Sequence, residues 1–364
     1  MKYLFILGNN PELSKAEILN VIDAKKIIAK SAKILAVETD KLNCKNLMLQ
    51  LGGTIKIGKI IADQPEIDSV LEIAETVSGK FKFGFSFYDV KPSNIGMQIK
   101  GKLKEKGISS RLVTSKEPTL SAVIITKEKC HDFIVTSDFF AQTCAVQDFQ
   151  AFGQRDFGRP ASDALSGMLP PKVARMMVNL SDADPEKILL DPFCGSGTVL
   201  AEALSLGYTN LVGTDLSEKA IEDSKINLDW LITELKINDY NLKIELADAK
   251  NLSQKFEDNS IGAIVSEPYL GNPIKGNENE NTLKRIVRDL EELYLKSFKE
   301  FHKILQVGGR AVIVIPEWHV GDKILKMDIF AQIGKLGFKR LDNGKLIYKR
   351  EGQKVWRNIT IWEK

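Results

Sequence analysis

Three acidic residues in the second half of the chain stand at the ends of short apolar runs. Asp191 follows "KILL" and opens the turn "DPFCGSGT", Asp215 closes "LVGTD", and Asp248 lies in "ADA" after "LKIEL". A carboxylate at a strand end can accept hydrogen bonds from the hydroxyls of a ribose or from an adenine amine. Three successive carboxylates would repel a pyrophosphate, so they predict a cofactor with an adenosine and a cationic amino-acid tail. S-adenosylmethionine has this chemistry.

The turn after Asp191 has the composition of a ligand-binding turn at the start of a helix. Gly195 and Gly197 allow the backbone to bend tightly and to approach a ligand closely. In an open α/β sheet, such a helix start lies at the carboxyl ends of the strands and presents free N–H groups. A glycine turn alone is also an ordinary strand-to-helix connection. Its spacing to Asp215, 24 residues after Asp191, is what favours a cofactor site.

These motifs together resemble a known family. "DPFCGSGT", "GTDLSEKAI", "ADA" and "SEPY" resemble the class I methyltransferases that modify exocyclic amino groups of nucleic-acid bases. The preceding "DFGRPASDALSGMLPPKVARMMVNL" is similar to the segment that closes over the methionine end of the cofactor in tRNA guanine-N2 methyltransferases with a THUMP domain. "YLFILGNNPELSKAEI" and "SSRLVTSKEPTLSAVIITK" look like the N-terminal ferredoxin-like and THUMP modules of the family that methylates guanosine ten of tRNA. The resemblance covers nearly the whole chain, and its motifs are more specific in the second half.

The resemblance implies that S-adenosylmethionine is the cofactor and that it lies along the carboxyl ends of the first three strands. The residues expected to contact it come from the closing segment, the glycine turn and the next two strand ends; they are Gly167, Pro170, Asp191, Phe193, Gly195, Gly197, Thr198, Asp215, Leu216, Asp248 and Ala249.

The fourth strand is expected to end in the catalytic loop "SEPY", where the resembling enzymes usually carry Asp or Asn, two prolines and an aromatic residue. The lone pair of the reacting amine is delocalised into the base, so acceptors must hold its N–H groups while the nitrogen becomes pyramidal. The expected catalytic residues are Ser266, Glu267, Pro268 and Tyr269, with Tyr269 stacked on an extruded base. We expect the Ser266 hydroxyl and the Glu267 carbonyl to be the acceptors; a charged Glu267 side chain is the alternative. The polar "GNPIKGNENENT" that follows is expected to be a substrate lid or a surface loop.

The first 145 residues alternate short apolar runs with polar segments of helical spacing. We expect strands at "KYLFILG", "KSAKILAVET", "FKFGFSFYD", "SAVIITK" and "DFIVTSD", and helices at "PELSKAEILNVID" and "SNIGMQIKGKLKEKG". This mixture predicts small α+β modules, which the resemblance implies are a ferredoxin-like module at residues 1–55 and a THUMP-like RNA-binding module at 56–146. Residues 147–165 break the periodicity and are expected to be a linker. Several basic residues in and after it could contact phosphates or simply be solvated, namely Arg155, Arg159, Lys172 and Arg175.

From residue 187 onward, strands and helices alternate, beginning with "KILLDPF" and "GTVLAEALSLG" and reaching "RAVIVIP". Continuous apolar strands that alternate with helices predict a parallel sheet covered on both faces. The final "GKLIYKREGQKVWRNITIWEK" is expected to form two strands joined by a Glu-Gly-Gln turn, which would add an antiparallel edge. The expected fold class is therefore α/β. A Rossmann-like class I methyltransferase domain over residues 166–364 would follow the α+β ferredoxin-like and THUMP modules.

Basic residues exceed acidic ones only in the first part of the chain. Residues 1–160 contain 23 Lys and Arg against 18 Asp and Glu, whereas the remainder contains 28 against 30. One cluster stands out in "IKGKLKEKGISSR", where the basic residues are Lys100, Lys102, Lys104, Lys106 and Arg111. We expect this cluster to contact RNA phosphates. A solvated helix face is the alternative.

The cysteines and histidines form no recognisable set of ligands. Cys44, Cys130, Cys144 and Cys194 include no CxxC pair and no histidine at metal spacing. We therefore expect buried, reduced cysteines, no disulfide framework and no metal site. Without a run of about eighteen apolar residues or a secretory signal, we expect a cytoplasmic protein.

Together these features predict an S-adenosylmethionine-dependent RNA methyltransferase that modifies the N2 amine of a guanosine in tRNA. An rRNA or DNA amino-methyltransferase could use the same site. A protein that binds the cofactor or RNA without turnover is a further alternative, because Ser266 is unusual at its position. Structured RNA is the expected partner, and the sequence leaves open whether a small activating protein is needed.

Overall fold

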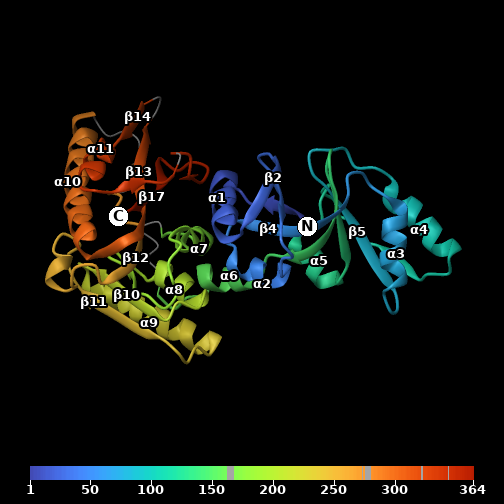
Figure 1. Ribbon diagram of the computed structural model, residues 1–364, viewed down its shortest axis with the longest axis horizontal. Coiled ribbons are helices and arrows are strands. Elements are labelled where there is room, and N and C mark those ends of the chain that lie inside the picture. The colour runs from blue at the N-terminus through green and yellow to red at the C-terminus, as the bar shows by residue number, and fades with distance from the viewer. Residues whose placement is uncertain (162–167, 273, 275–279, 321–322, 343) are drawn as a thin grey trace. The chain divides into compact units, whose positions relative to one another are not determined.

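The computed structural model describes residues 1–161, 168–272, 274, 280–320, 323–342 and 344–364 (Figure 1). The chain forms two compact units. The first contains residues 1–15 and 22–151, and the second contains residues 16–21 and 152–364.

The first unit is built on one sheet of eight strands in the order β2-β3-β1-β4-β8-β7-β5-β6. The strands are β1 (Lys2–Leu7), β2 (Ala24–Lys30), β3 (Ile34–Thr39), β4 (Thr54–Ala62), β5 (Phe81–Phe87), β6 (Ser110–Leu112), β7 (His131–Val135) and β8 (Phe140–Val146). Five helices accompany them, namely α1 (Pro11–Val21), α2 (Cys44–Gln50), α3 (Ile67–Glu75), α4 (Ile95–Glu105) and α5 (Ala122–Glu128). Strand β4 pairs with β1 on one side and with β8 on the other. The sheet therefore continues across residues 55 and 56, where the boundary between two modules was expected.

One expectation for this part of the chain is wrong. "SAVIITK", expected as a strand, forms helix α5, because Ser121 caps the helix by accepting a hydrogen bond from the backbone N–H of Ile124. The expected linker contains helix α6 (Phe149–Phe157). Its buried residue, Phe152, packs against the guanidinium groups of Arg155 and Arg175 in the second unit. Cation–π contacts thus support a helix in a segment with little apolar periodicity.

The cysteines also depart from expectation. Cys44 at the start of α2 and Cys144 in β8 form a disulfide, although 100 residues separate them. Their Cα atoms lie 5.9 Å apart, a separation that a disulfide spans readily. Cys130 and Cys194 are buried free thiols, as expected.

Among its described residues, the second unit contains a nine-stranded sheet whose main path is β11-β10-β9-β12-β13-β17-β15. Its strands are β9 (Leu189–Asp191), β10 (Asn210–Asp215), β11 (Asn241–Leu246), β12 (Ile261–Ser266), β13 (Leu305–Val320), β14 (Lys323–Lys326), β15 (Lys339–Arg340), β16 (Ile347–Tyr348) and β17 (Val355–Glu363). Along this path, the neighbouring strands β11, β10, β9, β12 and β13 are parallel to one another. Strands β14 and β17 each pair antiparallel with β13. Strand β16 pairs antiparallel with β17, which confirms the expected hairpin at the end of the chain.

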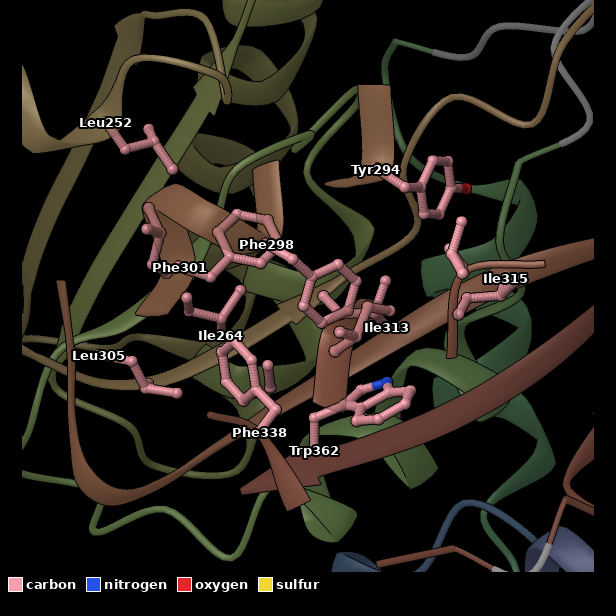
Figure 2. Packing of buried hydrophobic residues seen from close by; sticks show 14 of the residues in the cluster. Leu252, Ile264, Tyr294, Phe298, Phe301, Leu305, Ile313, Ile315, Phe338 and Trp362 are labelled. Atoms are coloured by element: carbon pink, nitrogen blue, oxygen red, sulfur yellow. The ribbon is translucent and has the colours of Figure 1, made fainter. Parts of the chain in front are cut away.

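Helices cover both faces of this sheet, as the alternating pattern predicted. They are α7 (Pro171–Leu180), α8 (Thr198–Ser205), α9 (Glu218–Leu235), η1 (Leu252–Gln254), α10 (Glu280–Ile304) and α11 (Phe330–Lys335). The neighbouring residues Val212 and Gly213 of β10 point to opposite faces of the sheet, and each face is covered by a different helix. Val212 belongs to the core that Phe298 and Phe301 of α10 form with the strands (Figure 2). A Cβ on Gly213 would collide with Leu200 of α8.

Among the described residues, no helix is both long and apolar enough to cross a membrane. Within the same residues, no group of three or more His, Cys, Asp or Glu side chains is arranged to hold a metal ion.

Candidate active site

The site lies where the order of the parallel strands reverses. Strands β10 and β11 follow one another outward on one side of β9, and the chain then returns to place β12 on the other side of β9. In open α/β sheets, ligands bind outside the carboxyl ends of the strands at such a switch point. The predicted acidic residues and the "SEPY" loop all follow these strand ends, so the fold brings them to one edge of the sheet.

The glycine turn forms the first wall of the site. Gly195 and Gly197 have φ angles of +50° and +83°, which other residues rarely adopt. A Cβ on Gly197 would also lie only 3.1 Å from the Ser224 hydroxyl of α9, so both conformation and close packing require glycine there. Thr198 then begins α8, whose first N–H groups point toward this edge.

Asp215 at the end of β10 is anchored by the backbone around it. Its carboxylate accepts hydrogen bonds from the N–H groups of Gly195 and Ser217, each at 3.0 Å. These bonds fix the orientation of a half-exposed carboxylate beside the glycine turn. The next residue, Leu216, exposes 62% of its surface and adds an apolar face beside that carboxylate.

Asp248 lies in the loop after β11 and has similar anchors. Its carboxylate accepts a 2.9 Å hydrogen bond from the N–H of Lys250 and lies 3.3 Å from the Lys250 ammonium. The adjacent Ala249 is buried. Phe193 of the glycine turn is half-buried and packs against the main core. The predicted residues of this edge thus combine anchored carboxylates with apolar surface.

Asp191 and Ser266 meet across the switch point. Asp191 is 2% exposed and Ser266 is completely buried. The Ser266 hydroxyl donates a 2.6 Å hydrogen bond to Oδ1 of Asp191, which also accepts from the N–H of Phe193. Burial raises the pKa of Asp191 to about 7, although the hydrogen bonds from Ser266 and Phe193 oppose this rise.

Glu267 is held by an arginine that the sequence reasoning missed. Arg357 of β17 donates two hydrogen bonds to the Glu267 carboxylate, at 2.6 and 3.0 Å. Burial raises the pKa of Glu267, and the hydrogen bonds and charge of Arg357 counteract that rise. Arg357 lies 90 residues away, in a strand with no visible motif, so only pairing between β13 and β17 brings it to the loop.

The rest of the loop faces outward. Pro268 is buried, whereas Tyr269 exposes 53% of its surface. The backbone carbonyl of Tyr269 accepts a 3.4 Å hydrogen bond from the buried Tyr294 hydroxyl of α10. The hydroxyl of Tyr269 donates a hydrogen bond to the Asn272 side chain. The backbone is thus anchored while an aromatic ring stands at the surface of the site.

Arg159, which the sequence suggested only as a phosphate contact or a solvated residue, suits the carboxylate in the amino-acid tail of S-adenosylmethionine. Its guanidinium is largely buried and donates a 2.7 Å hydrogen bond to Thr198 at the start of α8. Its Nε is buried and has no hydrogen-bond partner among the described residues. An unsatisfied guanidinium N–H at a helix start suits a carboxylate, and the methionine end of the cofactor carries one. Neighbouring Ala161 is fixed by hydrogen bonds to the Asn227 side chain.

Gly167, Pro170, the expected lid and the basic residues near the expected linker are the remaining candidates from the sequence. Gly167 lies outside the described residues, and half of the expected lid "GNPIKGNENENT" does so as well. Pro170 is buried immediately before α7. Arg155 and Arg175 each donate a 2.6 Å hydrogen bond to the fully buried Glu202, so their positions serve the core of the second unit.

The predicted RNA-binding cluster lies in the first unit. Lys100, Lys102 and Lys104 are exposed on α4, whose buried side consists of apolar residues such as Ile99 and Leu103. Two other members have carboxylate partners: Lys106 pairs with Glu75 at 2.7 Å and Arg111 pairs with Glu128 at 3.2 Å.

Comparisons with known proteins agree with this arrangement. Residues 159–336 match the family of RMKL-like methyltransferase domains. The tRNA (guanine(10)-N2)-dimethyltransferase of Pyrococcus abyssi is 27% identical over 327 residues, which cover 87% of this chain and 88% of that protein. A probable tRNA (guanine(10)-N2)-dimethyltransferase of Methanothermococcus thermolithotrophicus is 33% identical over 113 residues, or 30% of this chain and 67% of that protein. The crystal structure of TrmN from Thermus thermophilus aligns over 100% of both chains with a TM-score of 0.52 and 16% identity.

The parallel sheet, the glycine turn and the acidic strand ends define a class I S-adenosylmethionine-dependent methyltransferase, and the likeness to TrmN shows the same fold. The relatives narrow this class. The chain belongs to the family of tRNA guanine-N2 methyltransferases.

Proposed function

We propose that this protein transfers a methyl group from S-adenosylmethionine to the exocyclic N2 amine of a guanosine in tRNA. The observation that carries the proposal is the Glu267 carboxylate, which Arg357 holds at the end of β12. The preceding residue, Ser266, touches Asp191 at the end of the first cofactor strand. Glu267, which can accept a hydrogen bond from an amine, therefore directly follows the residue that contacts Asp191.

The bound cofactor would supply an electrophilic methyl group, and the acidic strand ends would orient it. Asp215 and Asp248 are placed to accept from the ribose and the adenine, and Arg159 to bind the methionine carboxylate. The reacting methyl group would then lie above the ends of β9 and β12. These assignments explain why the carboxylates are anchored by backbone N–H groups.

Glu267 is the proposed acceptor for the guanine amine. A carboxylate offers about four lone-pair positions, and a bidentate arginine occupies two of them. The remaining ones can accept N–H bonds from the amine, stabilise the positive charge that develops on nitrogen, and take up the proton that nitrogen loses. The Ser266 hydroxyl, preferred on sequence grounds, is buried and donates to Asp191. The charged Glu267 side chain is therefore the better-supported alternative.

Tyr269 is proposed to stack on the base that carries this amine. Base–aromatic stacking contributes about 1–3 kcal/mol per base and is the usual way to hold an unpaired base. The ring is exposed, and the carbonyl hydrogen bond from Tyr294 restrains its backbone. Stacking would orient the N2 amine edge toward Glu267.

Several observations support tRNA as the substrate. The Pyrococcus abyssi relative, named as a tRNA guanine-N2 enzyme, aligns with both units of this chain. The first unit carries the exposed lysines of α4, and we propose that residues 1–146 bind the RNA as ferredoxin-like and THUMP-like modules. The names of the relatives suggest guanosine ten as the first position to examine.

Methyl transfer from labelled cofactor to tRNA, rRNA and DNA tests the proposal. We expect label in tRNA only, recovered by mass spectrometry as N2-methylguanosine or N2,N2-dimethylguanosine. A transcript with adenosine in place of the modified guanosine should lose all label. Label in rRNA or DNA alone would overturn the assignment, and cofactor binding without transfer to any of the three would indicate a binding protein.

A further inference from the structure

A strongly basic turn lies beside the proposed catalytic loop in the second unit. It joins β16 to β17 and consists of residues 349–354, "KREGQK", with three basic residues and one acidic residue. We call these residues the basic turn. The second unit has no excess of basic residues as a whole, so this concentration is local.

A short series of contacts connects the basic turn to Glu267. Glu267 is bound by Arg357, and Tyr348 lies opposite Arg357 in the pairing of β16 with β17. The Arg357 guanidinium lies 5.8 Å from the centre of the Tyr348 ring. The Tyr348 hydroxyl in turn accepts a 2.6 Å hydrogen bond from Nε of Arg350. Three side-chain contacts therefore separate Arg350 from the proposed acceptor.

Trp356 holds the second cation of the turn. Its ring stacks on His319 with centroids 3.5 Å apart, and the Lys349 ammonium lies 3.6 Å from the same centroid. Two groups this close to one centroid must occupy opposite faces of the ring. Trp356 is thus no stacking platform for a base; it fixes the charge of Lys349 at the surface.

Both cations remain available to a ligand. Lys349 and Arg350 are exposed, and in the described part of the chain neither forms an ion pair with a carboxylate. A long cationic side chain on a solvated surface normally keeps its conformational freedom. Here Tyr348 and Trp356 restrain both side chains, which lowers the entropy cost of binding a phosphate.

We propose that the basic turn binds the phosphate backbone of the RNA next to the nucleotide that is methylated. The inference rests on the proposed function, because it requires an RNA strand at Glu267. RNA is favoured by charge complementarity and by the contacts that join the turn to the catalytic loop. The turn would then position the substrate from the second unit, independently of the lysines in the first.

The test removes the two positive charges of Lys349 and Arg350 and compares the effect with that of removing two other lysine charges in the same unit. The double variant Lys349→Gln/Arg350→Gln is matched by Lys335→Gln/Lys339→Gln. Both control lysines are exposed, and Lys339 of β15 lies opposite Glu363, at the end of β17 that is farther from the basic turn. Binding of unmodified tRNA transcript to full-length protein is measured over a range of salt concentrations, with methyl transfer and cofactor affinity in parallel.

We expect the test variant to bind tRNA about tenfold more weakly and to flatten the slope of log affinity against log salt by about 1.4 to 1.8, since each phosphate contact contributes about 0.7 to 0.9. Cofactor affinity should not change, and saturating tRNA should restore most of the methylation rate. The control variant should bind with the wild-type slope. Trp356→Leu should weaken tRNA binding less than the double variant, because it frees Lys349 without removing its charge.

Two results would overturn the inference. One is an unchanged affinity and slope in the test variant. The other is an equal loss in the control variant, which would reduce the effect to general charge. The wild-type protein is assayed for tRNA methylation under the same conditions. If it methylates tRNA, either result counts against the basic turn alone; if it methylates no tRNA at all, the proposed function itself has failed.

Discussion

Two ion pairs of the chain, one in each unit, are built differently. In the first unit, Lys56 of β4 pairs with Asp132 of β7 at 2.8 Å, with both side chains at most 1% exposed. Lys56 also donates to the Ser86 hydroxyl, which donates to Asp132. Asp132 accepts a further hydrogen bond from Thr143. Side chains of three other strands thus occupy three of the roughly four lone-pair positions of the carboxylate.

The pair in the second unit is open. Among the described residues, Arg357 is the only hydrogen-bond partner of the Glu267 carboxylate. The pair stands at a strand end beside the exposed ring of Tyr269. A closed network can only stabilise the fold, whereas a carboxylate with unused lone pairs at a ligand-binding edge can receive a substrate. The two carboxylates differ in their partners and also in exposure, since the Glu267 side chain is 15% exposed whereas the Asp132 side chain is fully buried.

The largest expected effect comes from breaking the closed pair. Asp132→Ala leaves the Lys56 ammonium buried without its counter-charge, which should cost about 3–5 kcal/mol of unfolding free energy. Urea unfolding should show the loss in the transition of the first unit. Cofactor affinity, a property of the second unit, should be unchanged. Replacing both residues by apolar ones, as in Lys56→Met/Asp132→Leu, should recover much of the loss; a double variant as unstable as the single one would contradict this account.

Changing the open pair should affect turnover and leave the fold intact. Glu267→Gln keeps the shape of the side chain but removes the charge that stabilises the reacting amine. We expect the single-turnover rate to fall about 10²–10³-fold, the effect of removing one preorganised transition-state contact. Cofactor affinity should change little, whereas thermal stability should fall modestly, because Gln keeps a hydrogen-bond acceptor for the buried Arg357 guanidinium but removes its counter-charge. Glu292→Gln, on the exposed ion pair with Lys296, is the matched control and should react normally. A normal rate for Glu267→Gln would exclude its carboxylate as the acceptor.

Much of this architecture could be predicted because it depends on local patterns. The strands that end in Asp191 and Asp215, the strand just before Asp248 and the glycine turn follow directly from the residues. The failures have a different origin. Helix α5 is rich in β-branched residues, and only its serine cap opposed the expected strand.

Contacts between distant segments carried no sequence signal. The disulfide joins Cys44 and Cys144 across 100 residues because α2 packs beside β8. Arg357 reaches Glu267 only through the antiparallel pairing of β17 with β13. A lone arginine in an alternating strand resembles any solvent-facing residue, so its role required the three-dimensional structure.

A smaller effect is expected in the pH dependence of cofactor binding. Burial raises the pKa of Asp191 to about 7 without ligand. A cationic cofactor nearby would favour the carboxylate and lower that pKa, so binding should release a proton and strengthen as the pH rises. Between pH 6 and 8 the affinity should increase about tenfold. Calorimetry in buffers of different ionisation enthalpy measures the released proton.

Two variants sharpen this test. Asp191→Asn should remove the pH dependence. Asp215→Ala should weaken binding about tenfold at every pH, because it loses charge-assisted hydrogen bonds to the ribose. Affinity that is independent of pH in the wild type would mean that Asp191 does not face the cationic part of the cofactor.

The smallest effect separates the two possible roles of Ser266. If its hydroxyl only donates to Asp191, then Ser266→Ala removes a hydrogen bond that keeps the pKa of Asp191 down. The pH curve of cofactor binding should move to higher pH, by up to about one unit for a hydrogen bond of about 1 kcal/mol. At pH 8 and saturating cofactor the single-turnover rate should stay near the wild-type value. If the hydroxyl were instead an acceptor for the amine, the pH curve would stay in place and the rate would fall about 5- to 150-fold, equivalent to about 1–3 kcal/mol. Ser260→Ala, which removes an exposed hydroxyl bonded to a backbone carbonyl, should change neither quantity.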